Sequence, residues 1–154
     1  MVTATRALLG ALLLSVTLPA CSTSPDDPGD DLAANRRQWQ SQHIADYQVQ
    51  YSVSCFCVTD VTAPVVLQVR GGKIVSVTRV SDGVAIPESR WEGLYYTVDQ
   101  MFALIADARA KGAAEVRVDY HPMLRYPTTV FIDQSLRTAD EERHFFMSGL
   151  EPRR

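Results

Sequence analysis

The chain has 154 residues, of which 46% are hydrophobic, and a formal net charge of −3. This length predicts one domain. An acidic chain without a basic cluster argues against nucleic acid as a partner.

Residues 1–20 have the features of a secretory signal peptide. Arg6 precedes an apolar run from Ala7 to Leu18, which is too short to span a bilayer as a permanent helix. The sequence Leu18-Pro19-Ala20-Cys21 resembles the lipobox of bacterial lipoproteins. The resemblance implies cleavage before Cys21, lipidation of Cys21, and anchoring at the extracytoplasmic face of a bacterial cell membrane. The alternative is a secreted protein that is cleaved after Ala20, with Cys21 as a free thiol.

Residues 21–31 are predicted to be the lipidated cysteine and a flexible tether. Ser22 to Asp31 contains Pro, Gly and four Asp but no apolar residue, a composition that stays solvated. Residues 32–154 then form a single domain. We expect its first helix from about Asp31 to His43, with Leu32 and Trp39 on the buried stripe.

Alternation of polar and apolar residues predicts a strand from Tyr47 to Cys57. Two further strands, 65–70 and 73–80, meet through Gly71-Gly72, a hairpin signal. The register after this turn is open, since Ile74, Val75 and Val77 do not all face one side.

Residues 81–96 are predicted to be a connecting loop. Thr97 and Gln100 form a capping box at the start of a second helix, which Gly112 ends. Its apolar stripe has helical spacing; it consists of Val98, Met101, Phe102, Ile105 and Ala108.

Three more strands are expected at 115–120, 128–133 and 143–150. The fold class is therefore α+β, one antiparallel sheet of about six strands beneath two helices, with a duplicated α-β-β-β unit.

The chain also resembles a family of small bacterial lipoproteins of unknown function, domain-of-unknown-function family 6174. The shared pattern spans about Trp39 to Pro152 and includes Ile44 to Tyr47, Cys55-Phe-Cys57, Gly71-Gly72-Lys73, Thr97 to Phe102, Val118 to Tyr120, Tyr126-Pro127, Phe131 to Asp133 and Asp140 to Glu142. Relatives often carry Gly where this chain has Arg125. The resemblance implies the location and the single domain, but no activity.

Cys55 and Cys57 are two residues apart on the first strand. Cα atoms at this spacing lie about 6.6 Å apart in a strand, near the upper limit of about 6.8 Å for a disulfide. Outside the cytoplasm paired thiols are normally oxidised, so we predict a structural Cys55–Cys57 disulfide. The alternatives are thiol exchange, copper or zinc binding with His121 or His144, and free or intermolecular thiols.

Other candidate sites are less specific. Asp133, Asp140, Glu141 and Glu142 flank one turn; they are either calcium ligands or, more simply, a solvated turn.

A binding surface is predicted either on the polar face of the sheet or on the 81–96 loop. The residues concerned are Gln48, Gln50, Arg117 and Asp119 on the sheet, and Trp91, Tyr95 and Tyr96 on the loop. The loop aromatics have a second interpretation, closure of the core.

The sequence shows neither a catalytic constellation nor a cofactor motif. We therefore expect a non-enzymatic lipoprotein with a binding or structural role in the cell envelope, with the membrane and an unknown envelope protein or small ligand as partners. The alternative is a thiol-redox or metal-handling protein that uses Cys55 and Cys57. A hydrolase is a third, weaker alternative.

Overall fold

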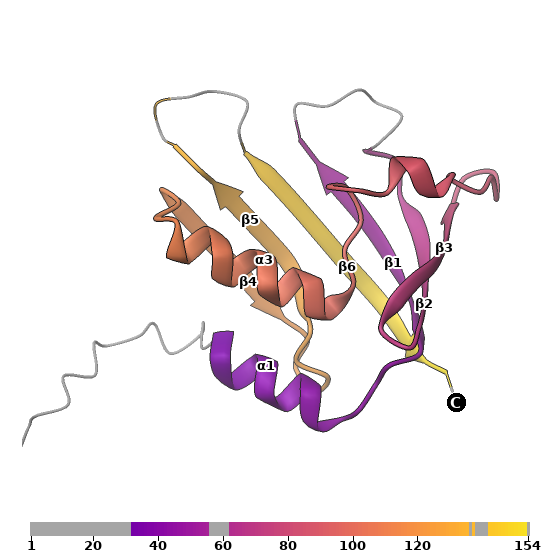
Figure 1. Ribbon diagram of the computed structural model, residues 1–154, viewed down its shortest axis with the longest axis horizontal. Helices are drawn as coiled ribbons and strands as arrows, with labels where there is room; N and C mark the ends of the chain where they lie inside the picture. Colours follow the sequence, from indigo (N-terminus) through magenta and orange to yellow (C-terminus); the bar gives the residue numbers. More distant parts are fainter. Residues whose placement is uncertain (1–31, 56–61, 136, 138–141, 154) are drawn as a thin grey trace, which may run out of the picture.

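A computed structural model describes residues 32–55, 62–135, 137 and 142–153. It contains one six-stranded sheet of order β3-β2-β1-β6-β5-β4, in which every neighbouring pair is antiparallel (Figure 1). The strands are β1 (Tyr47–Ser54), β2 (Val65–Arg70), β3 (Lys73–Arg79), β4 (Glu115–Tyr120), β5 (Pro127–Asp133) and β6 (Arg143–Pro152). The α-helices are α1 (Leu32–Ser41) and α3 (Val98–Ala110). This arrangement confirms the predicted α+β class.

The predicted repeat is present in the element order, because α1 and α3 are each followed by three strands. The two units do not occupy equivalent places in the sheet. Strand β1, the first of its unit, is central and pairs with β6, whereas β4, the first of the second unit, lies at an edge. The repeated order therefore does not produce a symmetric sheet.

The core lies on one face of the sheet. Alternate residues of β1 are buried there, as the period of the strand requires, and Figure 1 shows α3 and α1 on the same side of the sheet. Trp39 is the fully buried residue of α1, with 2% of its surface exposed, and the partly buried Leu32 packs against the same core. No helix in the described part of the chain is long and apolar enough to cross a membrane.

Helix α3 has both predicted end signals. The Thr97 hydroxyl accepts a hydrogen bond from the Gln100 N–H, and the Gln100 side chain accepts one from the Thr97 N–H, which completes the capping box. The chain leaves the helix through Gly112, whose φ of 72° suits glycine. All five residues of the predicted apolar stripe are buried.

A β-bulge resolves the register of β3. Ile74 pairs with Val69 and Val77 pairs with Leu67, so Val75 is the extra residue. Val75 is 53% exposed, while Val77 is buried. In a regular strand Ile74 and Val77, which are three residues apart, would face opposite sides of the sheet. The bulge places Val77 on the core face together with Ile74.

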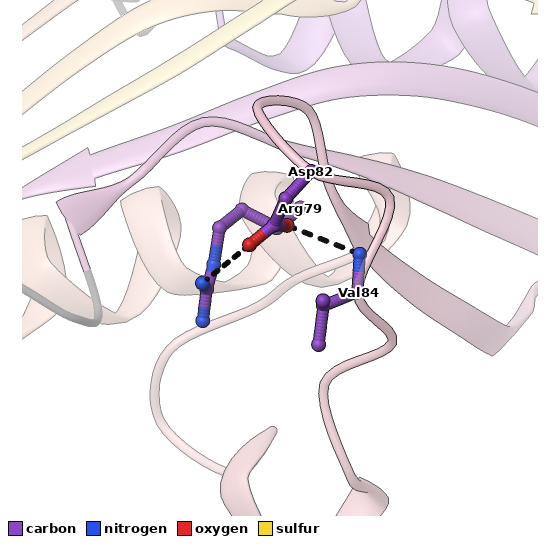
Figure 2. A network of polar contacts seen from close by, with 3 residues as sticks. All are labelled: Arg79, Asp82 and Val84. Carbon is purple, nitrogen blue, oxygen red and sulfur yellow. Dashed lines mark hydrogen bonds and ion pairs between the residues drawn. The ribbon is translucent and has the colours of Figure 1, made fainter.

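Residues 81–96 begin with a tight turn after β3 (Figure 2). The Asp82 carboxylate accepts hydrogen bonds from the Arg79 side chain at 2.9 Å and from the Val84 N–H at 3.1 Å. Ala85 then bridges to Thr78, and the short 3-10 helix η1 (Glu88–Arg90) follows. The buried Ile86 and Tyr95 bring this segment onto the core face.

Candidate binding face of the sheet

The second face of the sheet has no helix packed on it within the described residues. Gln48 and Gln50 of β1 lie on this face, as do Arg117 and Asp119 of β4, so the four predicted polar residues share one surface. Strands β6 and β5 separate the two pairs. We call this surface the open face.

Aromatic residues occupy the middle of the open face. Phe131 of β5 pairs with His144 of β6, and Thr129 pairs with Phe146. The ring centroids of Phe131 and His144 lie 4.5 Å apart at 86°, and those of His144 and Phe146 lie 6.0 Å apart. The first pair has the edge-on arrangement that aromatic quadrupoles favour, and the second is tilted at 57°.

A cation covers one end of this aromatic row. The Arg117 guanidinium lies 4.3 Å from the Phe131 ring centroid, within the range of a cation–π contact. Phe131 is consequently only 8% exposed, although no helix covers it in the described chain. Phe146 remains 40% exposed and is the accessible phenylalanine of the aromatic row.

The sequence predicts neither Phe131 nor Phe146 as a binding residue, although it carries one signal for an exposed ring at Phe146. Phe145 and Phe146 are adjacent in a strand, so their side chains must point to opposite faces. Phe145 is buried with 1% exposure, which leaves Phe146 on the other side. A phenylalanine pair in a strand with one covered face therefore indicated an exposed ring.

Some polar residues on either side of the aromatic row are already paired. Gln48 donates to the Glu151 carboxylate at 2.7 Å and accepts from Arg153. Arg117 forms an ion pair with Glu115 on the same strand. Gln50 is exposed beside Ser148, its partner across β1 and β6. The accessible centre is thus aromatic, and polar side chains of β1 and β4 lie on either side of it.

The aromatic residues of the loop are placed as core closure requires. Tyr95 is 6% exposed, and its ring lies 5.8 Å from that of Tyr51. Trp91 donates from Nε1 to the Ile86 carbonyl at 2.9 Å, and Tyr96 packs edge-on against Phe145 at 5.7 Å. Of the two interpretations of Trp91, Tyr95 and Tyr96, these contacts favour closure of the core.

The candidate cysteine and histidine ligands do not converge in the described structure. Cys55 follows β1 and packs against the core, whereas His144 pairs with Ser54 and lies on the open face. His121 follows β4, beyond the Tyr120–Pro127 pair, at the end of the sheet opposite His144. Cys57 and the lipidation candidate Cys21 lie outside the described residues.

The acidic candidates are only partly described, since Asp140 and Glu141 lie outside the described residues. Asp133 is 5% exposed and accepts a hydrogen bond from the Ser135 N–H at 2.8 Å. Glu142 is exposed before β6. Among the described residues no group of three His, Cys, Asp or Glu side chains is placed to hold a metal ion.

Comparison with family models gave a match to "Family of unknown function (DUF6174)" over residues 31–152. This confirms the family expected from the sequence. Comparison with curated proteins gave no match, and comparison with solved structures gave none.

Proposed function

We propose that this chain, which belongs to the family of unknown function DUF6174, is a bacterial lipoprotein. It would be anchored at the extracytoplasmic face of the membrane. In this proposal it acts without catalysis, as a binding module of the cell envelope. The observation that carries the binding role is the open face, a sheet surface with an exposed aromatic centre and a polar rim.

Three properties of the open face support recognition of a partner. Phe146 offers apolar surface at the centre of the sheet, where contacts can be shielded from water. Arg117 and His144 are held against Phe131 by ring contacts, so their ordering is largely complete before binding. Aromatic residues and Arg are also the types enriched in interface centres.

The N-terminal sequence supports the anchor. A lipid on Cys21 would hold the chain at the membrane through the methylenes that it buries. Residues 22–31 then set the reach of the domain, which is at most about 36 Å when the tether is fully extended. A partner on the open face would therefore lie close to the membrane surface or in the adjacent envelope layer.

We also propose that Cys55 and Cys57 form the disulfide of this domain. In the structure Cys55 lies directly after β1 and packs against the core, a position suited to fixing the end of the central strand. Redox exchange or metal handling through the same pair is the alternative function. A reducible bond or a bound metal would distinguish it from a structural disulfide.

Lipid labelling and site-specific photo-crosslinking together test the proposal. Cys21→Ser should abolish incorporation of labelled fatty acid and release the protein from membranes. A photo-reactive residue replacing Gln50 on the open face should give a discrete adduct in native envelopes. The same residue replacing Asp107, which is exposed on α3, is the matched control and should give none. Membrane retention of Cys21→Ser, or identical labelling from both positions, would contradict the proposal.

A further inference from the structure

The open face ends in a hollow of about 420 Å³ beside Phe146. Its walls come from β5, β6 and the turn between β4 and β5, and all of its lining residues are described. The volume falls at the small end of the range for small-molecule sites, about 300–1,000 Å³. None of the positions that the sequence singled out as binding candidates lines it, apart from His121.

An interruption in β6 shapes one wall of the hollow. Ser148 pairs with Gln50 and Glu151 pairs with Gln48, so β6 carries an extra residue between these pairs. Gly149 has a φ of 59°, the left-handed conformation that such a bulge uses. β6 stays paired with β1 on both sides of the bulge, whereas its pairing with β5 ends at Thr129 and Phe146, so the hollow lies beside β6 at the start of β5.

The opposite wall is held by the Tyr126 ring, which is 2% exposed and hydrogen-bonded to the Leu150 backbone. The His121 ring stacks on it with centroids 5.0 Å apart at 15°. His121 Nδ1 accepts hydrogen bonds from the N–H groups of Leu124 at 3.0 Å and Met123 at 3.3 Å. A neutral imidazole with Nδ1 as acceptor carries its proton on Nε2, which makes Nε2 a donor.

The lining combines a flat apolar wall with small neutral polar groups. Phe146 supplies the ring, while Thr128, Thr129 and Ser148 supply hydroxyls. The Thr128 hydroxyl donates to the Asp119 carbonyl at 3.1 Å and keeps its lone pairs as acceptors. The lining contains no Asp, Glu, Lys or Arg. An ionic ligand would therefore lose its hydration there without gaining an opposite charge.

We propose that this hollow binds one neutral pyranose ring of a glycan, stacked on Phe146. A pyranose has an apolar face of C–H groups, which suits the negative face of an aromatic ring. Its hydroxyls project around the edge of the ring, where the hydroxyls of Thr129 and Ser148 and the His121 donor are available. The inference rests on the proposed binding function and names its ligand class.

Calorimetric titration of the full chain, purified in detergent, tests the ligand class. The probes are the neutral trimer of N-acetylglucosamine and maltotriose, with trigalacturonate as the anionic control. We expect binding of a neutral trimer that is at least about tenfold tighter than binding of trigalacturonate. Co-sedimentation with purified cell-wall glycan then distinguishes a polymeric source from a free oligosaccharide.

Variants of Phe146 test the stacking. Phe146→Ala should weaken binding of the neutral trimer at least about tenfold, whereas Phe146→Tyr, which keeps an aromatic face, should change it by less than about threefold. Phe146→Leu keeps apolar area without a ring and should behave like Phe146→Ala. Val75→Ala, on the exposed bulge of β3, is the matched control and should bind as the wild type does.

The inference is overturned if no neutral trimer binds or if trigalacturonate binds as tightly. Full binding by Phe146→Leu would also overturn it, because the ring would then be irrelevant. A crosslinked protein partner at Gln50 without any sugar binding would overturn the sugar inference alone and leave the proposed function standing.

Discussion

The phenolic oxygen of Tyr47 accepts a hydrogen bond from the backbone N–H of Val98 at 2.9 Å. Val98 is the first residue of α3, where backbone N–H groups have no partner within the helix. Tyr47 is 1% exposed, and Trp39 of α1 packs edge-on against its ring at 5.8 Å. One side chain of the central strand therefore joins both helices to the sheet.

Tyr47→Phe should lower the free energy of unfolding by about 1–3 kcal/mol, because the Val98 N–H is left buried without its acceptor. Urea denaturation of the two proteins gives this difference. Tyr96→Phe is the matched control, since its hydroxyl donates to the Gly93 carbonyl at an exposed site. Its effect should stay below about 0.5 kcal/mol. Equal losses for both variants would show that the Tyr47 contact adds no particular stability.

Alkaline pH should destabilise the domain through the same buried phenols. Burial raises the pKa of Tyr47 and of Tyr51 above the ordinary value of 10.0, and it also raises the pKa of Tyr126. A raised folded-state pKa contributes stability that is complete below about pH 10 and is lost as the pH rises toward the folded value. Urea midpoints should thus begin to fall near this pH. The fall should be shallower in Tyr47→Phe, and an identical pH profile would contradict this role.

Phe102→Ala should lower the free energy of unfolding by about 3–5 kcal/mol. Phe102 is fully buried on α3, and its ring stacks on Tyr120 with centroids 6.1 Å apart. Removing the ring leaves a cavity between the helix and β4. Asp107→Ala, on the exposed side of the same helix, should change stability by less than about 0.5 kcal/mol. A Phe102→Ala loss as small as this would place the stripe outside the core.

Local signals in the sequence were sufficient for most of the fold. The capping pair Thr97 and Gln100 located the start of α3, and alternation after Tyr47 identified the central strand. The sequence predicts a last strand that ends at Leu150, but β6 continues to Pro152. Its extension depends on pairing with β1 past the bulge at Gly149, a non-local contact that periodicity within β6 does not reveal.

The candidate site was less accessible to prediction. Strand alternation is local information, so the sequence predicts the polar residues Gln50 and Arg117 on one face, where the structure places them. The aromatic row required the pairing of Phe131 with His144, which depends on the register between two strands. The hollow depends on the bulge in β6 and on the Tyr126 contact with Leu150, both of which are tertiary features.

Arg125→Gly should raise the free energy of unfolding by up to about 1 kcal/mol. Arg125 has a φ of 61° in the turn between β4 and β5, a conformation that costs a residue with a Cβ about 1–2 kcal/mol and glycine almost nothing. The greater freedom of glycine in the unfolded chain offsets part of this gain. Arg125→Ala removes the same side chain but keeps the strain, so it should show no gain. Equal stability of the Gly and Ala variants would exclude backbone strain as the cause.

The Cys55 and Cys57 pair can be tested by mass, metal content and stability. If the two form a structural disulfide, protein from an oxidising compartment should lack free thiols at both positions and be lighter by a pair of hydrogens. The Cys55→Ser, Cys57→Ser double variant should lose less than about 2 kcal/mol, because so short a loop restricts the unfolded chain little.

The single variant Cys55→Ser is the control for this experiment, since its remaining thiol should form intermolecular disulfides that the double variant cannot form. Stoichiometric copper or zinc that is lost in the double variant would instead support metal handling. A bond that glutathione reduces readily would support thiol exchange, particularly if reduction changes crosslinking from Gln50. Recovery of the native protein with both thiols free would exclude the structural disulfide.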